Sequence, residues 1–465
     1  MKRLIAALLV VASSSIALAS PATDLFEQAG QFLVTQYFGP SKTDLNALVA
    51  KYRAQLTTAC TSSGNACAYG VAEPLIEAML EELEDFHAYF LNAEAVRQRD
   101  ANAQGQNIAP SPRLGFQHRA FADDNDKLLS FDRLISNVIP NGPAERAGVQ
   151  AGDRWIGFDG TLFSSFKTQE EYTAGLQGFT RLVQSGAAVR MILLRGVDRN
   201  RLELTVQGQI INLSQTPQLS IRADNIAVIR VRDYQILGIG QQVHTLVSRA
   251  MTLGARGIVF DLRGNGGGYA NERWFTAGAF IANPEPQRRV PRYNAEANTR
   301  EEGYANGQYF VRTLSGQIIN SQRLSTPTLY SGPLTVLVDG DCASACEYFS
   351  SSIQRAKRAP VIGEPTVGIG STNTQGFKLV NGAEVSLPTL QAFWPDGTAL
   401  PSRVTPDIQT KNYELELFER GRDAVLDRAL ETLSSAANAT LERSIPAILE
   451  LPLPRGYMPT PEVRQ

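Results

Sequence analysis

The sequence predicts an α/β protein with several domains. From residue 217 to residue 412, apolar runs of strand length alternate with segments of helical periodicity, as in a parallel-type sheet covered by helices. Residues 111–210 alternate short strands with turns, and in residues 20–109 apolar positions recur three and four apart, which indicates helices. With 465 residues the chain is too long for one ordinary core, so two to four domains are expected.

The first residues have the features of a secretory signal. Met1-Lys2-Arg3 precede a short apolar stretch, and Ala17-Leu18-Ala19 offers small residues for cleavage. We therefore expect residues 1–19 to be a signal peptide and the protein to be exported, to the periplasm or the extracellular space. No later stretch approaches the roughly 18 to 20 apolar residues that a membrane span needs, so no stable membrane span is expected.

Residues 20–109 are expected to form an N-terminal helical domain. Its periodicity is clearest from Pro74 to Leu83, and the polar stretch from Arg97 to Asn107 is typical of a linker. At the other end, a helix from Glu414 to Leu433 and a Pro-rich tail from Leu451 are expected within residues 413–465.

Residues 111–210 resemble a PDZ domain. The resemblance rests on the run from Val138 to Val149, followed by Gly152-Asp153-Arg154-Trp155-Ile156. It implies a carboxylate-binding loop whose backbone N–H groups receive the C-terminus of a peptide while that peptide adds as an edge strand. This loop consists of Arg113, Leu114, Gly115 and Phe116. A PDZ fold that only braces the core is the alternative.

Two strands in the core are each followed by residues suited to chemistry. The run from Gly257 to Leu262 ends in Arg263-Gly264-Asn265-Gly266-Gly267-Gly268, a loop that can bring bare N–H groups close to a substrate. A phosphate-binding loop would need Lys-Ser or Lys-Thr next, and Tyr269-Ala270 follows instead.

The second strand, Leu334 to Val338, leads to Asp341-Cys342-Ala343-Ser344-Ala345-Cys346-Glu347 at the start of a helix. Helix N-termini present free N–H groups and the positive end of the helix dipole, which would stabilise an oxyanion beside the Ser344 hydroxyl. Serine is also common there simply as a cap. In a parallel-type sheet, ligands gather beyond the carboxyl ends of strands, where Gly267 and Ser344 both lie.

These motifs, with Gly363-Glu364-Pro365-Thr366 and Val404-Thr405-Pro406-Asp407-Ile408 after them, resemble the carboxyl-terminal processing and tricorn-type serine peptidases. The resemblance covers most of the chain after residue 19. It implies a ClpP/crotonase-like peptidase core with an inserted PDZ domain and an N-terminal helical segment. It also implies that Ser344 is the nucleophile, that Gly267 and Ala345 form the oxyanion hole, and that polypeptides are the substrates.

This chain lacks the lysine that serves as general base in the processing peptidases. The processing peptidases have a lysine in a Gly-Lys-Gly step where this chain has Gly368-Ile369-Gly370. His87 is the leading substitute, because tricorn-type members use a histidine from this part of the chain, and Asp85 is a candidate to orient it. Lys378 is a weaker alternative. The third catalytic residue stays unassigned.

The cysteines form two close pairs. In an exported protein we expect a disulfide between Cys60 and Cys67, which flank a flexible loop. Cys342 and Cys346 flank Ser344 and are either bridged or packed as two small buried side chains. The three histidines have no ligand spacing to the cysteines, so no metal site and no cofactor are expected. His118 and His244 are expected to be structural.

Two functions remain. The formal net charge is −2 with both signs interspersed, which gives no basic excess for binding nucleic acid. The first function is an exported serine endopeptidase in which His87 activates Ser344. The second is a catalytically inactive protein that binds peptide or another ligand on the same scaffold, because a serine hydroxyl without a base is a weak nucleophile. The oligomeric state and the substrate sequence are left open.

Overall fold

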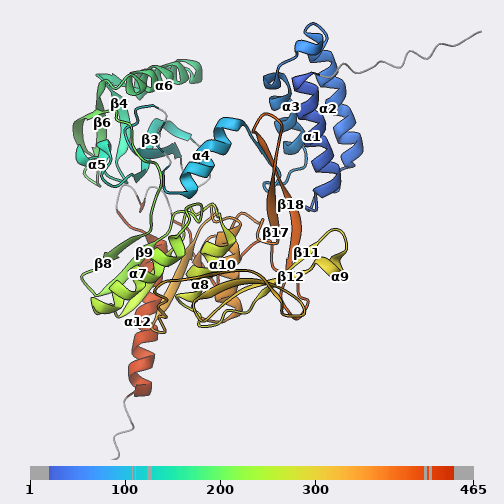
Figure 1. Cartoon of the computed structure of the whole chain (residues 1–465). Helices are drawn as coiled ribbons and strands as arrows, with labels where there is room; N and C mark the ends of the chain where they lie inside the picture. Colours follow the sequence, from blue (N-terminus) through green and yellow to red (C-terminus); the bar gives the residue numbers. More distant parts are fainter. Residues whose placement is uncertain are drawn as a thin grey trace, which may run out of the picture.

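The computed structural model describes residues 20–106, 108–109, 111–122, 128–412, 416–417 and 421–444. The expected signal peptide and the Pro-rich tail lie outside the described residues. Figure 1 shows a helical part, a small part containing α6, and a larger core below both, with β17 and β18 reaching from the core to the helical part. No helix in the described ranges has the length and hydropathy that a membrane crossing requires.

The N-terminal part is a three-helix unit. Its helices are α1 (Pro21–Gln36), α2 (Leu45–Cys60) and α3 (Tyr69–Glu81), with a short 3₁₀ turn (Gly64–Ala66) before α3. Ser20 and Asp44 cap α1 and α2 by accepting backbone N–H bonds. The predicted disulfide between Cys60 and Cys67 is present. It joins the end of α2 to the segment that leads into α3.

The rest of the predicted helical domain contains a strand. β1 (Tyr89–Leu91) pairs with β18 of the core, so the helical part is joined to the core by backbone hydrogen bonds. The linker prediction for Arg97 to Asn107 is wrong for residues 97–103, because α4 (Ala93–Ala103) covers them. Asn92 caps this helix through its side chain, and Glu94 bonds Arg97 and Gln98 along the helix.

Residues 116–207 form a separate sheet with two helices. Its strands are β2 (Phe116–Ala122), β3 (Leu128–Val138), β4 (Arg154–Phe158), β5 (Thr161–Leu162), β6 (Ala188–Arg195) and β7 (Asn200–Gln207). They lie in the order β2-β3-β4-β6-β7, and β5 pairs with β4. The helices are α5 (Pro143–Arg146) and α6 (Gln169–Gln184), and a 3₁₀ turn covers Phe163–Ser165. The fully buried Trp155 lies at the centre of this core, against Phe163 and Phe179.

A mainly parallel sheet forms the centre of the molecule. Its order is β19-β16-β15-β10-β9-β8, where only β8 runs antiparallel to its neighbour. The strands are β8 (Gln218–Ile221), β9 (Ile226–Arg230), β10 (Gly257–Asp261), β15 (Leu334–Val338), β16 (Val361–Gly363) and β19 (Ile408–Gln409). The predicted alternation of strands and helices is therefore confirmed.

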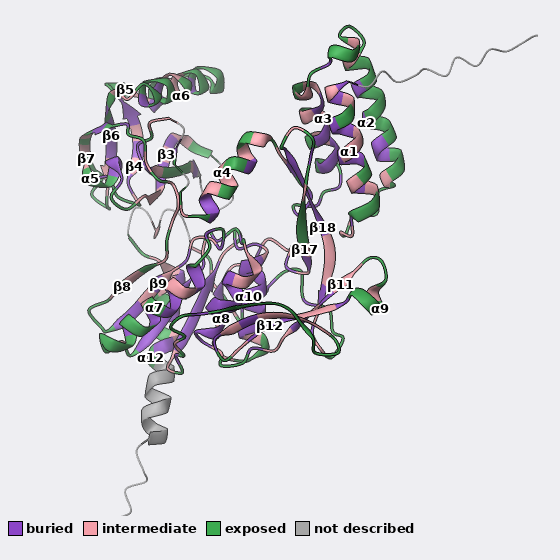
Figure 2. Cartoon of the chain, viewed as in Figure 1, coloured by how far each residue is buried: buried purple, intermediate pink, exposed green. Residues whose placement is uncertain are grey.

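Helices cover both faces of this sheet. Ile258 and Phe260 of β10 pack in one cluster with α7 (Ile239–Thr252) and α10 (Ala345–Arg355), while Val259 packs against α12 (Ala424–Ser444) on the other face. Figure 2 shows β9 and α10 largely purple, as expected for elements buried on most sides. α12 covers the second half of the helix that was predicted from Glu414 to Leu433.

A second sheet flanks the core. Its order is β1-β18-β11-β12-β13-β14, and β17 also pairs with β18. It contains β11 (Gln287–Pro291), β12 (Arg300–Ala305), β13 (Gln308–Thr313), β14 (Ile318–Arg323), β17 (Thr372–Lys378) and β18 (Glu384–Phe393). A short α9 (Ala295–Asn298) connects β11 to β12, and α8 (Ala270–Gly278) packs against β12 and β13.

Candidate active site

The site begins where two neighbouring strands end. β10 and β15 are parallel and in register, with Asp261 opposite Leu337, so the loops that follow them emerge side by side. The Ala343 N–H donates to the backbone oxygen of Asn265 at 3.0 Å, which ties the two loops together directly. The topology thus brings the glycine loop and Ser344 to one place, as the two motifs predict.

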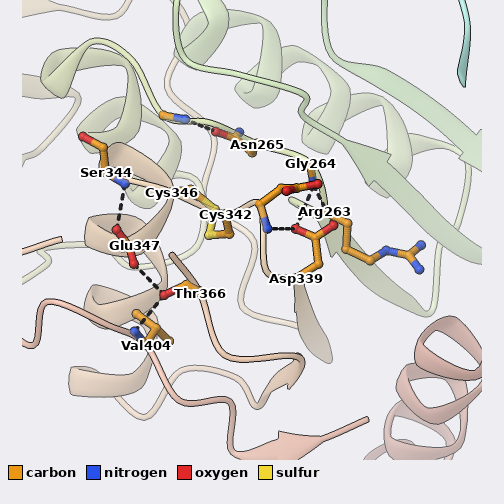
Figure 3. The surroundings of a disulfide bond; sticks show 12 residues. Arg263, Gly264, Asn265, Asp339, Cys342, Ser344, Cys346, Glu347, Thr366 and Val404 are labelled. Atoms are coloured by element: carbon orange, nitrogen blue, oxygen red, sulfur yellow. Dashed lines mark hydrogen bonds between the residues drawn. A yellow bond between two sulfur atoms is a disulfide. The ribbon is translucent and has the colours of Figure 1, made fainter. Parts of the chain in front are cut away.

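Ser344 stands at the N-terminus of α10 in an unusual conformation. Its φ of 51° and ψ of −113° lie outside the regions that L-residues prefer, and such outliers persist only where the surroundings hold them. Its N–H donates to Glu347 Oε2 at 2.8 Å (Figure 3). Within the described part of the chain, no capping hydrogen bond holds the Ser344 side chain, although Ser344 and Glu347 have the arrangement of a capping box.

A buried carboxylate holds the backbone around this serine. Besides the Ser344 N–H, Glu347 accepts hydrogen bonds from Thr366 Oγ1 at 2.6 Å, Gly368 N–H at 2.7 Å and Ile369 N–H at 3.1 Å. Burial raises the pKa of Glu347, and the bond from Thr366 opposes this. Thr366 Oγ1 in turn accepts from the Val404 N–H, as Figure 3 shows. Glu347 therefore links the Ser344 backbone to the segment of Gly368 and Ile369, where the processing peptidases have a lysine.

The glycine loop lies directly against Ser344. Gly267 has φ +93°, and a Cβ there would lie 2.9 Å from Ser344 Cβ and 3.0 Å from the Ala345 nitrogen. Only glycine fits this approach. Asn265 supports the loop from inside, because its Nδ2 donates to the Val231 oxygen and its Oδ1 accepts from the Gly267 N–H at 2.9 Å.

The two predicted oxyanion donors are adjacent but not equivalent. No acceptor for the Ala345 N–H exists among the described residues, as expected for the first N–H of a helix. The Gly267 N–H is engaged by Asn265. An oxyanion at this place would therefore meet one free donor and one that must be shared with an amide oxygen.

His87 is buried and has one unused nitrogen. It is 5% exposed, and its Nδ1 forms a 2.7 Å hydrogen bond with Thr372 Oγ1 of β17. Nε2 has no partner in the described part of the chain. Burial lowers the pKa of His87 to about 4, while the negative charge of Asp85 opposes the shift. The ring is therefore neutral at pH 7, the state that a general base requires.

Asp85 was predicted to orient the imidazole of His87, but its carboxylate forms no hydrogen bond with that ring. Asp85 Oδ1 accepts the backbone N–H of His87 at 2.9 Å, and Oδ2 accepts the Tyr37 hydroxyl at 2.9 Å. Asp85 thus holds the loop, while Thr372 contacts the imidazole. No hydrogen bond joins His87 to Ser344. The base role of His87 stays a prediction.

Two partners in the site were not singled out by the sequence. The role of Glu347 had a signal, since it belongs to the Ser-Ala-x-Glu motif. Thr372 had no signal of its own in the sequence. The weaker candidate Lys378 lies elsewhere on β17, more than half exposed, at 3.5 Å from Glu384 and 3.8 Å from Asp100.

A disulfide crosses the turn that contains Ser344. Cys342 and Cys346 are bonded and fully buried, with their Cα atoms 5.5 Å apart. Figure 3 places this bridge between the Ser344 turn and the glycine loop. Of the two predicted alternatives, the structure therefore has the bridged cysteines and not the unbonded pair.

The remaining histidines have other surroundings. The His244 Nδ1 accepts from the Thr328 N–H, and its Nε2 therefore donates to the Phe275 oxygen, so His244 is structural as expected. His118 lies on β2 against Trp155, with ring centroids 5.4 Å apart. It is also a strand side chain, as expected.

The loop predicted to bind a carboxylate begins the sheet of residues 116–207. Arg113 pairs with Gln209, Leu114 is buried, Gly115 has φ +84°, and Phe116 starts β2. A Cβ at Gly115 would lie 3.3 Å from side-chain atoms of Ile211 and Pro143. This loop belongs to a different sheet from that of Ser344.

Comparison with known proteins finds similarity to one peptidase family, mainly in the core. Residues 225–410 match the model of peptidase family S41. The carboxy-terminal processing protease CtpA of Bacillus subtilis is 23% identical over 337 residues, which are 72% of this chain and 63% of that protein. The chloroplastic carboxyl-terminal-processing peptidase 2 of Arabidopsis thaliana is 26% identical over 343 residues, 71% of this chain and 59% of its own. The matches thus span less than two thirds of these relatives.

A solved structure supports the fold. A putative S41 protease from Bacteroides fragilis aligns over 90% of this chain and 97% of its own, with a TM-score of 0.52 and 14% identity. At this identity the likeness concerns the fold alone. The chain therefore has a mixed α/β fold similar to S41 proteases.

Proposed function

From the similarity of residues 225–410 to peptidase family S41, we propose that this protein is a serine endopeptidase that hydrolyses polypeptides. The observation that carries the proposal is the Ser344 turn: a strained serine without a capping hydrogen bond, at a helix N-terminus, against a glycine loop. A protein that only binds ligands gains nothing from this strain or from glycines that are costly to order.

The reaction uses four groups. His87 Nε2 takes the proton of Ser344 Oγ, which attacks the scissile carbonyl carbon. The N–H groups of Ala345 and Gly267 stabilise the resulting oxyanion. His87 then returns the proton to the leaving amine as the C–N bond breaks. In the second half, His87 takes a proton from a water molecule that attacks the acyl carbon, and it returns this proton to Ser344 Oγ as the bond from Oγ to the acyl carbon breaks.

His87 has to approach Ser344 for this reaction. Its buried, unpartnered Nε2 supports the assignment, because a buried polar atom without a partner is costly unless it is used. Asp85 and Thr372 hold its loop and its ring. We further propose that the chain is exported through residues 1–19, that its core is of the ClpP/crotonase type, and that the PDZ-like loop Arg113–Phe116 holds the C-terminus of the substrate.

A second candidate is an inactive binding protein on the same scaffold. It is favoured by Ile369 at the place of the family lysine and by the lack of a hydrogen bond between His87 and Ser344. The two candidates differ in whether Ser344 reacts covalently.

A fluorophosphonate probe on the purified full chain decides between them. We expect labelling of the wild type and none of Ser344→Ala, with Ser351→Ala of the same helix as the matched control that still reacts. Hydrolysis of an unfolded polypeptide should follow the same pattern. Equal labelling of the wild type and Ser344→Ala would refute the nucleophile and leave the binding protein.

A further inference from the structure

A buried group of charges lies beside the helix that carries Ser344. Arg273 of α8, Arg289 of β11 and Glu302 of β12 are 1%, 4% and 4% exposed. Arg289 forms a 2.7 Å ion pair with Glu302, and Arg273 approaches the same oxygen at 3.5 Å. Tyr348, one turn after Ser344 on α10, has its ring 4.9 Å from the Arg273 guanidinium and 4.6 Å from that of Arg289.

This cluster has a surplus of positive charge. Arginine does not lose its proton inside proteins, so both guanidinium groups are charged. Burial would raise the pKa of Glu302, but Arg289 and Arg273 lower it to about 2, so the carboxylate is ionised. Burial raises the pKa of Tyr309 and of Tyr348, so both phenols are neutral. Two positive charges therefore face one negative charge.

The same two arginines have unused hydrogen-bond donors. Arg273 Nε, Arg273 Nη1 and Arg289 Nη1 are buried without an acceptor among the described residues. The nearby amide is already occupied, because Gln287 Oε1 accepts from Nη2 of Arg273 at 2.8 Å and from Nη2 of Arg289 at 3.2 Å. Unpaired donors on a buried charge are among the most costly groups a protein can hold.

We propose that Arg273 and Arg289 bind a small monovalent anion of the size of chloride. Such an ion supplies both things that the cluster lacks, an acceptor for the N–H groups and one negative charge. A water molecule would satisfy the donors but not the charge. A peptide carboxylate or a larger anion does not suit the site, because all three donor atoms are closed to solvent.

The pKa of Arg273 agrees with this assignment. Burial, and next the neighbouring charge of Arg289, lower it to about 9, the direction expected for a cation short of counter-charge. The bound anion would join α8, β11 and the first turns of α10. It would thus support the helix that positions Ser344, independently of whether that serine is a nucleophile.

Thermal unfolding of the full chain tests the proposal. Sodium chloride is exchanged for sodium gluconate at constant ionic strength, since gluconate is too large for the site. We expect the unfolding midpoint of the wild type to rise by on the order of 5 °C for each hundredfold increase of chloride above its Kd. Arg273→Met, which keeps the length of the side chain and removes the surplus charge, should abolish this rise.

A matched variant separates this effect from the loss of any buried arginine. Arg358 donates to three backbone oxygens that do not belong to the cluster, those of Phe280, Tyr330 and Gly332. Arg358→Met should unfold at a lower temperature but keep the full response to chloride. A wild-type midpoint that does not depend on chloride would overturn the proposal.

A crystal of the wild-type chain grown in bromide gives a direct test that needs no variant. We expect an anomalous peak within hydrogen-bond distance of both Arg273 and Arg289. Density for water alone at that position, with no anomalous signal, would overturn the proposal.

Discussion

At the scale of single residues, the ring of His87 depends on one hydroxyl. Thr372 Oγ1 is its only hydrogen-bond partner in the described part of the chain, at 2.7 Å. If Nδ1 donates to this oxygen, Nε2 carries the lone pair that a base needs. Thr372→Val keeps the shape and removes the bond. We expect kcat to fall roughly tenfold to hundredfold, a part of the roughly hundredfold to ten-thousandfold that a general base contributes, because the imidazole itself remains.

The conservative variant provides the control for this prediction. Thr372→Ser keeps a hydroxyl and should retain most of the activity, whereas a purely structural role of Thr372 would make both variants unfold earlier with kcat unchanged. Steady-state kinetics on a polypeptide substrate, with the midpoint of thermal unfolding measured in parallel, separates the two cases.

The buried imidazole also predicts a pH dependence of stability. The pKa of His87 is about 4 in the folded chain, lowered from 6.5 mainly by burial. Between these values the unfolded chain binds a proton that the folded chain does not, so the free energy of unfolding falls as the pH falls from 6.5 to 4. The loss amounts to about 3 kcal/mol. It should be absent in His87→Gln.

Urea denaturation of the wild type and His87→Gln across this pH range checks the prediction. The difference between the two curves isolates His87 from the other titrating groups. Curves that stay parallel from pH 7 to pH 4 would show that His87 is accessible to protons in the folded state.

The sequence predicted some residues of the site and not others, for a physical reason. Gly267 and Ser344 follow strands whose order and direction are constrained by the α/β pattern, so their proximity could be inferred. The contact between His87 and Thr372 joins residues 285 positions apart in different elements. Such a contact depends on how β1, β17 and β18 assemble, which periodicity does not encode. The engagement of the Gly267 N–H by Asn265 depends on local loop geometry that glycine leaves open.

At the scale of elements, the Cys342–Cys346 bridge spans the turn that contains Ser344 and begins α10. A closed loop this short stabilises the chain by about 2 kcal/mol in the loop-entropy account. Replacing both cysteines by alanine should cost about that much free energy of unfolding. It should also lower kcat, because the unusual backbone of Ser344 loses a covalent constraint.

The second disulfide is a matched control for this prediction. Cys60 and Cys67 close a loop of similar length in the helical part, away from Ser344. Replacing this pair should reduce stability by a similar amount and leave kcat unchanged. Equal kcat in both double variants would show that the bridge beside Ser344 has no part in positioning it.

The errors in predicted elements have a common cause. The polar stretch from Arg97 to Asn107 was predicted to be a linker, yet the Asn92 cap and the bond between Glu94 and Arg97 support a helix over Ala93–Ala103. β1 is three residues long and was missed, because a strand that short has no period of its own. Its pairing with β18 is set by tertiary contacts.

At the scale of the whole molecule, contacts between parts extend the site beyond residues 225–410. Arg263 at the start of the glycine loop donates to Asp261 and to Asp423 beside α12, the latter at 2.7 Å. On the other side, β1 carries the His87 loop into the second sheet. The general α/β class was predictable from patterning, while these joints between parts were not.

The last prediction concerns the part that contains β2 and α6. If the loop Arg113–Phe116 binds the C-terminus of a substrate, then the free carboxylate is the group recognised, through charge-assisted bonds from backbone N–H groups. We expect the full-length Ser344→Ala chain, which cannot cleave, to bind a peptide with a free C-terminus at least about tenfold more tightly than the same peptide with an amidated C-terminus. A hydrogen bond to a charged group is worth about 1.5 to 3 kcal/mol.

A variant of the loop provides the control. Gly115→Val should abolish the difference in affinity, because Gly115 has φ +84° and a Cβ there would meet Ile211 and Pro143. Fluorescence anisotropy measures both affinities. Equal affinity for the two peptides would mean that this part only braces the core.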